Sequence, residues 1–189
     1  MRRSQEDTAK TRVRIIRAAA EMFRSRGIDA TSVADVMSAV GLTVGGFYRH
    51  FESKDALVAE AIERASQEVA GHGLDGYLSD THRKHAGRGC PVAALCSEVA
   101  HGSKVTKAAF TGALERLLTS VEAATPLRSR GDRRKVLFSA SAAVGALVLA
   151  RATHDESLAG EILSAARERL LEGAAKGAPR RGQHHPQKK

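Results

Sequence analysis

The chain has 189 residues, of which 42% are hydrophobic and only 4% aromatic, and it contains no tryptophan. A chain of this length forms one domain, or two small domains that share a core. Abundant alanine and scarce aromatic residues favour closely packed helices, because strands prefer β-branched and aromatic side chains. The composition therefore argues against a β-sheet protein and predicts an all-α fold.

The formal net charge is +9, and the excess of positive charge lies at the two ends of the chain. Residues 1–26 carry eight Lys and Arg against three acids, and residues 174–189 carry five Lys and Arg with no acid. Residues 27–173 are nearly neutral. A basic balance suggests a polyanionic partner, although net charge does not specify a fold.

Three features argue against secretion and against a membrane protein. Two cysteines, Cys90 and Cys96, are too few for a disulfide framework. The N-terminal residues MRRSQEDTAK lack the apolar region of a signal peptide. The longest uncharged run, Val136–Ala150, is shorter than the roughly 20 apolar residues of a membrane span, so we interpret it as a buried helix. We expect a cytoplasmic protein with no membrane partner.

Apolar residues recur at helical spacing along most of the chain after a basic arm, residues 1–10, that we expect to be mobile. Gly27 and Gly41 end helices, Thr31 or Ser32 can cap the second helix, and Ser53 can cap the fourth. A stretch with five glycines, residues 71–89, is predicted to be a loop, and the tail from Ala174 is predicted to be disordered. The predicted helices cover residues 11–26, 32–40, 43–51, 53–69, 91–101, 103–124, 132–153 and 157–173.

The most informative segment is residues 31–54, TSVADVMSAVGLTVGGFYRHFESK. Two short helices joined by a Val-Gly-Leu turn are typical of a helix-turn-helix, which presents its second helix to the major groove of DNA. A helix of about eight residues is not stable alone, so it must lean on its neighbours. Phe47 and Phe51 are the residues predicted to anchor it in the core.

The opposite face of this short helix has the chemistry of a DNA contact. Two adjacent glycines each cost about 1 kcal/mol in a helix interior, and they suit a close approach of the backbone to base edges. The residues predicted to lie on or beside the exposed face are Thr43, Gly45, Gly46, Arg49 and His50. The side chains able to donate hydrogen bonds to phosphate oxygens are Tyr48, Arg49, His50 and Lys54.

The motif GLTVGGFYRHFESK at residues 41–54 resembles the DNA-binding domain of the TetR family, and the likeness extends over residues 11–69. The resemblance implies an all-helical homodimer with an N-terminal helix-turn-helix domain, then a helical ligand-binding and dimerisation domain. It also implies an inducer that lowers affinity for DNA. Carried over by position, the phosphate contacts are Thr31, Thr43, Tyr48, His50 and Lys54, and the residues that reach bases are Val44 and Gly45.

Val44 departs from the family pattern, because many relatives carry a polar residue there. A valine side chain cannot form a hydrogen bond with a base, but it can pack against a thymine methyl group. Readout of the operator by shape or by glycine backbone contacts then carries more of the specificity.

The last two predicted helices resemble, more weakly, the pair that forms a four-helix bundle between two subunits in this family. Small residues on one helix would let it approach its partner closely, and apolar residues on the other form a stripe. The predicted dimer interface comprises Ala140, Ala143, Gly145, Ala146, Leu158, Ile162, Ala166 and Leu170.

The sequence therefore predicts a basic arm (1–10), a DNA-binding domain with the start of a connecting helix (11–70), a ligand-binding and dimerisation domain (71–173) and a basic tail (174–189). The predicted function is repression: a homodimer binds a palindromic operator in double-stranded DNA and is released by a small apolar inducer. The sequence does not identify the ligand-binding residues. We expect no cofactor, no metal and no catalysis, since the sequence contains no G-x-S-x-G or H-E-x-x-H motif and no glycine-rich phosphate loop after a strand.

Two other interpretations remain open at this stage. Cys90 at the start of a helix could serve a redox or electrophile sensor, or a small helical enzyme, because a helix N-terminus lowers a thiol pKa. The spacing of His82, His85, Cys90 and Cys96 matches no standard zinc pattern, so small buried thiols are the simpler interpretation. The chain could also be an activator or an architectural DNA binder that has no inducer.

Overall fold

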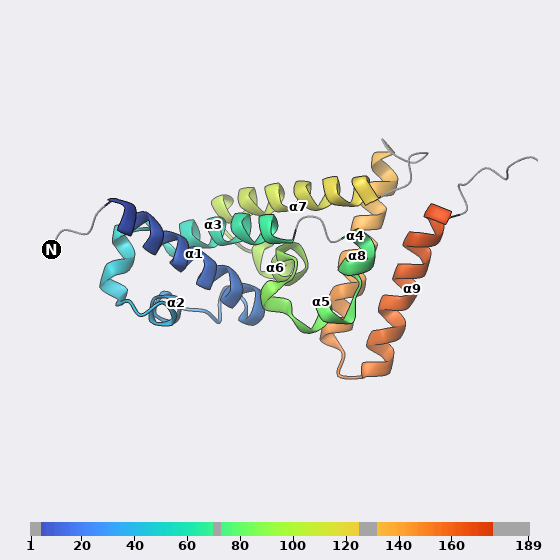
Figure 1. The fold of residues 1–189 in the computed structure, drawn as a ribbon, viewed down its shortest axis with the longest axis horizontal. Coiled ribbons are helices and arrows are strands. Elements are labelled where there is room, and N and C mark those ends of the chain that lie inside the picture. Colours follow the sequence, from blue (N-terminus) through green and yellow to red (C-terminus); the bar gives the residue numbers. More distant parts are fainter. Residues whose placement is uncertain (1–4, 70–72, 125–131, 176–189) are drawn as a thin grey trace, which may run out of the picture.

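The structure is a computed structural model that describes residues 5–69, 73–124 and 132–175. These residues form helices and connecting turns, and none of them forms a strand (Figure 1), which confirms the all-α prediction. The elements are α1 (Gln5–Arg26), α2 (Val33–Ala39), the 3₁₀ helix η1 (Val44–Arg49), α3 (Lys54–Glu68), α4 (Gly73–Tyr77), α5 (Asp80–Lys84), the 3₁₀ helix η2 (Ala86–Arg88), α6 (Pro91–Val99), α7 (Lys104–Ala124), α8 (Arg133–Ala152) and α9 (Glu156–Ala175).

The helices form an elongated body with α1 and α2 at one end and the antiparallel pair α8 and α9 at the other (Figure 1). Helix α3 packs against α1 on one side and against α7 on the other. Helix α6 contacts α1, α7 and α8. We call residues 5–69 the first half of the described chain and residues 73–175 the second half. Helices α3 and α6 join the two halves and so place the helix-turn-helix segment relative to the rest of the chain.

The helix ends follow the capping chemistry of the sequence. Ser32 caps α2 in a reciprocal box, since its hydroxyl accepts the N–H of Asp35 at 3.1 Å and the Asp35 carboxylate accepts the N–H of Ser32 at 2.8 Å. Ser53 caps α3 by accepting the N–H of Ala56. Gly27 has a φ of 93°, a left-handed conformation that suits glycine just after a helix.

The helix-turn-helix segment has a continuous apolar core. Phe47 from η1 is 1% exposed and stacks on Phe51 with a centroid distance of 5.5 Å. Ile15 and Phe23 of α1 and Ile62 of α3 belong to the same core. The buried face of α1 runs through Ile15, Ala19 and Phe23, so the apolar Val13 lies off this face and is 50% exposed.

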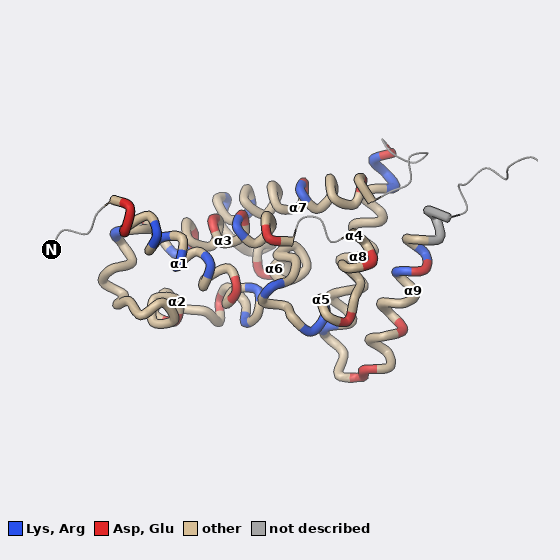
Figure 2. Tube along the Cα trace, in the orientation of Figure 1, with Lys and Arg blue, Asp and Glu red and all other residues tan. Residues whose placement is uncertain are grey.

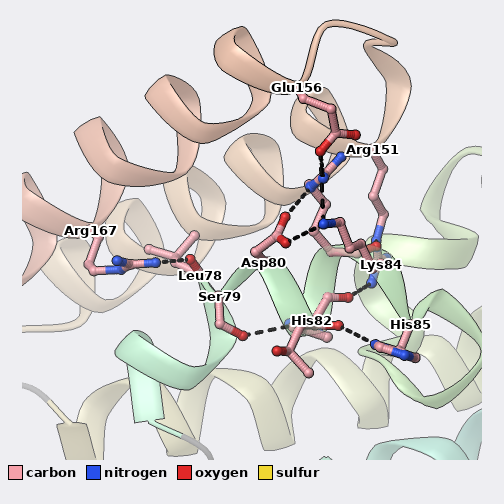
Figure 3. Close-up of polar contacts among 11 residues, drawn as sticks. Leu78, Ser79, Asp80, His82, Lys84, His85, Arg151, Glu156 and Arg167 are labelled. Atoms are coloured by element: carbon pink, nitrogen blue, oxygen red, sulfur yellow. Dashed lines mark hydrogen bonds and ion pairs between the residues drawn. The ribbon is translucent and has the colours of Figure 1, made fainter.

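Two predicted irregular segments are helical. Residues 5–10 of the expected mobile arm are the first turns of α1, and residues 1–4 lie outside the described residues. The predicted loop 71–89 contains α4, α5 and η2. Contacts from α8 and α9 hold α5, because Arg151 donates to the carbonyl groups of α5 and Arg83 pairs with Glu156 (Figure 3). Helix α9 extends to Ala175, and the rest of the predicted tail lies outside the described residues.

Helix α8 is long and apolar enough to cross a membrane by length and composition, which is weak evidence because core helices meet the same test. One face of the helix, including Ala143, Leu147 and Ala150, is buried inside the protein. The other face carries Phe138 and Leu149, which are 70% and 59% exposed. The prediction of a buried helix is therefore correct for one face of α8 and wrong for the other.

The core position of Phe47 gives a stability prediction. We expect Phe47→Ala to lower the free energy of unfolding by about 3–5 kcal/mol, because it removes a fully buried aromatic ring and leaves a cavity. Tyr48→Ala, one residue along and 72% exposed, should cost about 1 kcal/mol or less. Urea denaturation followed by circular dichroism measures both. Equal losses in the two variants would contradict the anchoring role of Phe47.

Candidate nucleic-acid interface

The short helix η1 projects several side chains away from the protein. It begins after Thr43, whose side chain forms no capping hydrogen bond with the helix and is exposed. Burial of Phe47 fixes the rotation of the helix, so Val44 is 45% exposed and Tyr48 is 72% exposed. Gly45 and Arg49 are also exposed. The structure thus brings together, on one outward face, five of the residues predicted to contact DNA.

The two glycines of η1 are not required by the packing of the protein itself. A Cβ atom at Gly45 would have no heavy atom within 4 Å, and one at Gly46 would meet only Met37 Cε at an ordinary 3.7 Å. Neither glycine has a positive φ. An alanine would fit at both positions and would form a more stable helix. The exposed Gly45 therefore leaves room for something outside the protein.

Thr31 is a correction to the predicted DNA contacts. Its side chain is completely buried, and its hydroxyl donates to the carbonyl oxygen of Gly27 at 2.8 Å. A side chain in that position cannot reach a phosphate. The neighbouring Ser32 takes the exposed capping position, which explains why the sequence alone could not choose between the two.

Lys54 is also engaged inside the protein. Its ammonium group donates to the carbonyl oxygen of Ile28 at 2.6 Å, which joins the start of α3 to the turn between α1 and α2. His50 is partly buried beside Phe51, and its carbonyl oxygen accepts a hydrogen bond from Arg12. The structure therefore places these two predicted phosphate contacts against the protein rather than on the open face of η1.

Two arginines of α1 support the helix-turn-helix and were missed in the sequence. Arg12 lies over the ring of Phe51, 4.8 Å from its centroid, and pairs with Glu60 of α3. Arg14 donates to the carbonyl oxygen of Val40, the C-cap of α2. In the sequence both arginines occupy ordinary polar positions of an amphipathic helix. Their roles could not be predicted, because they depend on which helices pack nearby.

Charge is unevenly distributed over this end of the molecule. Helix α1 carries several Lys and Arg, whereas the chain from α2 to the start of α3 is mostly uncharged (Figure 2). The acid of α2, Asp35, has its pKa lowered by the hydrogen bonds from the side chain and backbone of Ser32. Asp35 therefore stays ionised while it caps α2. The basic side chain of η1 itself is Arg49.

A junction of polar contacts joins the helix-turn-helix to the second half of the chain. Glu98 of α6 accepts the backbone N–H of Ile28 at 2.8 Å and that of Asp29 at 3.3 Å. Arg24 of α1, 5% exposed, donates to the carbonyl oxygen of Gly89 and pairs with Glu68. Burial raises the pKa of Glu68, but hydrogen bonds from arginines outweigh burial and hold its pKa below the usual value.

The second half contains two hollows that meet at Tyr77. One is a cavity of about 40 Å³ whose walls include Cys90, Leu117 and Ala143, and the other is a hollow of about 400 Å³ beside His82 and His85. Both ring nitrogens of His82 contact backbone groups: Nδ1 lies 2.6 Å from the carbonyl oxygen of Tyr77, and Nε2 accepts the N–H of Cys90. Within the described ranges, no three potential metal ligands cluster.

The two cysteines differ in their surroundings. Cys90 is 1% exposed, as expected for a small buried thiol, whereas Cys96 is exposed on α6, so that expectation was wrong for Cys96. Neither residue forms a disulfide.

The predicted dimer interface needs a correction on α8. Ala140, Ala143 and Ala146 are buried inside the protomer, because α8 uses its small residues to approach α9, α7 and α6. They are not available to a second subunit. A Cβ atom at Gly145 would lie in open space, and Leu158 of α9 is 45% exposed. The remaining predicted residues, Ile162, Ala166 and Leu170, are partly buried.

Comparison with known proteins agrees with the geometry of the helix-turn-helix. Residues 15–61 match the family model described as "Bacterial regulatory proteins, tetR family". The chain is similar to the transcriptional regulator TtgR of Pseudomonas putida, with 38% identity over 63 residues, which are 33% of this chain and 30% of that protein. It is 39% identical over 54 residues, 29% of the chain and 26% of the relative, to the repressor KstR2 of Mycolicibacterium smegmatis. The matched segment therefore spans less than a third of these relatives.

Solved structures share the fold over nearly the whole chain. The reduced form of NemR from E. coli superimposes with a TM-score of 0.69 at 18% identity, covering 90% of this chain and all 100% of that one. A TetR-family regulator from Agrobacterium tumefaciens has a TM-score of 0.67 at 20% identity, covering 85% and 97%. TtgR, KstR2 and the Agrobacterium protein are all named as transcriptional regulators or repressors.

The internal contact of Lys54 gives a prediction about stability. We expect Lys54→Met to lower the free energy of unfolding by about 1–2 kcal/mol, because the carbonyl oxygen of Ile28 loses a charged donor. Lys10→Met is the matched control, since that lysine pairs with Glu6 on the surface and should contribute little. Thermal unfolding compares the two variants. The result that would contradict this has two parts. The unfolding midpoint of Lys54→Met would be unchanged, and the slope of the logarithm of the DNA-binding constant against the logarithm of salt concentration would fall by about one unit. The ammonium group would then lie on a phosphate.

Proposed function

The chain belongs to the TetR family of bacterial regulatory proteins, and from that premise we propose that it is a repressor released from its operator by a small molecule. The observation that carries the proposal is the outward face of η1, where exposed Val44, Tyr48 and Arg49 surround a glycine backbone with open space beside it. A helix with a buried anchor on one side and an open backbone on the other suits the major groove of DNA.

The groups on this face divide by chemistry. Thr43, Tyr48 and Arg49 are exposed donors suited to phosphate oxygens, which fix the position of the protein on the duplex but carry no sequence information. Val44 offers an apolar contact for a thymine methyl group, and Gly45 allows the backbone to approach base edges. His50 and Lys54 act mainly by supporting η1 and the start of α3. Direct hydrogen-bonded readout is therefore sparse, and DNA shape supplements it.

A palindromic operator requires two copies of η1, and the outer face of α8 is the best candidate for holding them together. Phe138, Gly145 and Leu149 are spaced so that they share one face of the helix, and Leu158 of α9 is also exposed. Large apolar side chains exposed together mark interaction sites in proteins. We place the partner subunit against this outer face and not against the alanines on the inner face.

Release by a ligand follows from a shift between two arrangements of the dimer. A ligand that binds more tightly to the arrangement with mismatched half-site spacing removes the protein from DNA. In this proposal residues 11–70 bind the operator in the cytoplasm and residues 71–173 bind the ligand and dimerise. Sensing by the Cys90 thiol is less favoured, since the side chain is 1% exposed.

Gly45 provides the test of DNA recognition. We expect Gly45→Ala to reduce operator affinity at least tenfold, because the added methyl group lies on the face turned to the bases. The same substitution should leave stability unchanged or raise it by about 0.5–1 kcal/mol, since alanine favours a helix and has room here. Fluorescence anisotropy with operator DNA and thermal unfolding measure the two effects. Unchanged affinity would remove η1 from the DNA interface.

Leu149 provides the test of assembly. We expect Leu149→Glu to produce monomers and to weaken operator binding, because a charge would lie in the apolar contact between subunits. Val105→Glu is the matched control, as Val105 is 56% exposed but lies on α7. Sedimentation velocity distinguishes the species. A dimer that persists in Leu149→Glu, or that is lost equally in Val105→Glu, would refute this placement of the interface.

A further inference from the structure

The cavity of about 40 Å³ in the second half has an unpartnered polar group in its wall. Tyr77 is only 8% exposed and lines this cavity, and its hydroxyl has no hydrogen-bond partner of ordinary geometry among the described residues. Cys90 lies beside the hydroxyl, but a thiol is a weak hydrogen-bond partner. A buried hydroxyl without a partner is costly, so this position suits a ligand oxygen that accepts a hydrogen bond from the hydroxyl.

A positive charge without a carboxylate partner acts on two residues of the cavity wall, Tyr77 and Cys90. Arg151 of α8 donates through Nε and Nη2 to the carbonyl oxygens of Arg83 and His82, and its buried Nη1 has no partner in the described chain. Burial lowers the pKa of this guanidinium, and the groups that act against that effect are Tyr77 and Cys90 rather than a carboxylate. A buried cation that is not balanced by an acid favours an anion nearby.

The guanidinium of Arg151 is also fixed in position. A Cβ atom at residue 89 would lie 2.7 Å from Arg151 Nη2 and 2.8 Å from His82 Nε2, so only glycine fits between them. Arg151 does not line the cavity itself, but its charge acts on Tyr77 and Cys90, which do. Arg116, the arginine that lines the cavity, differs because it is already bonded to Ser66 and paired with Glu63. Of these two arginines, Arg116 has a carboxylate partner, whereas no ion pair balances the charge of Arg151 among the described residues.

We propose that the ligand of this protein is a compact monocarboxylic acid whose carboxylate accepts a hydrogen bond from the Tyr77 hydroxyl, in the field of the Arg151 guanidinium. Release of DNA by this acid rests on the proposed function, whereas binding of the acid to the chain does not depend on it. The cavity has room for a carboxylate group, and its remaining walls are largely apolar, including Leu74, Leu117 and Val121. An apolar chain or ring would pack on those walls.

Calorimetry on the full chain without DNA tests the site. The probes are sodium butanoate, hexanoate, octanoate and benzoate, each compared with its own primary amide, which has the same shape without the charge. We expect at least one acid to bind about tenfold or more tightly than its amide. If no acid of the series binds, or if the amides bind equally well, the assignment of an acid site is wrong.

Variants locate the site within the protein. Tyr77→Phe keeps the ring and should weaken acid binding about tenfold, while its melting temperature without ligand stays the same or rises because the unpartnered hydroxyl is gone. Arg151→Gln should abolish the preference for acid over amide and Arg151→Lys should retain it. Arg116→Gln, at the same cavity but already paired with Glu63, should retain it too. Loss of the preference in Arg116→Gln but not in Arg151→Gln would overturn the assignment.

Operator release separates this inference from the proposed function. Acids that bind the chain and lower its DNA affinity support both. Acids that bind with the expected variants but leave the DNA complex intact support the acid site and refute release by this ligand. Sequence-specific DNA binding that no acid affects, with no acid binding in calorimetry, leaves the DNA-binding role in place and refutes the acid site.

Discussion

The backbone of Ile28 is held through both its N–H and its carbonyl group, and the orientation of the DNA-binding segment depends on these two contacts. Its N–H donates to the Glu98 carboxylate on α6, and its carbonyl oxygen accepts the Lys54 ammonium at the start of α3. Gly27 makes this possible, because a Cβ atom there would lie 2.7 Å from Glu98 Oε1. The turn between α1 and α2 is thus joined to α3 and to α6, the two helices that connect the halves of the chain.

Helix α6 connects this turn to the cavity. Cys90, its N-cap, and Pro91, its first residue, line the cavity, while Glu98, near its other end, holds the turn after α1. Arg24 adds a second connection through the carbonyl oxygen of Gly89. A ligand that displaced the start of α6 would therefore act directly on groups that position η1. Because α6 is short, the cavity wall at its start and the Glu98 contact near its end belong to one rigid helix.

The small residues that fill this protein have two different uses. On α8 the alanines face inward, where they let α8 approach its neighbours closely, and the large Phe138 and Leu149 are left outside. On η1 Gly45 is exposed, and a Cβ atom there would have no heavy atom within 4 Å. The same preference for small side chains therefore serves close packing within the protomer in one case and an open surface in the other.

The sequence by itself determined the helical class, most helix boundaries and the helix-turn-helix, because capping residues, glycines and apolar spacing act over a few neighbouring positions. Phe47 and Phe51 could be assigned to the core and Gly45 to the surface for the same reason, whereas the outward position of Val44 followed from the resemblance to the TetR family. Only the tertiary structure decided that Thr31 is buried, that Lys54 binds the backbone, and that the alanines of α8 face inward. Each of these depends on which distant helix lies opposite, and helical periodicity defines a stripe without saying what covers it.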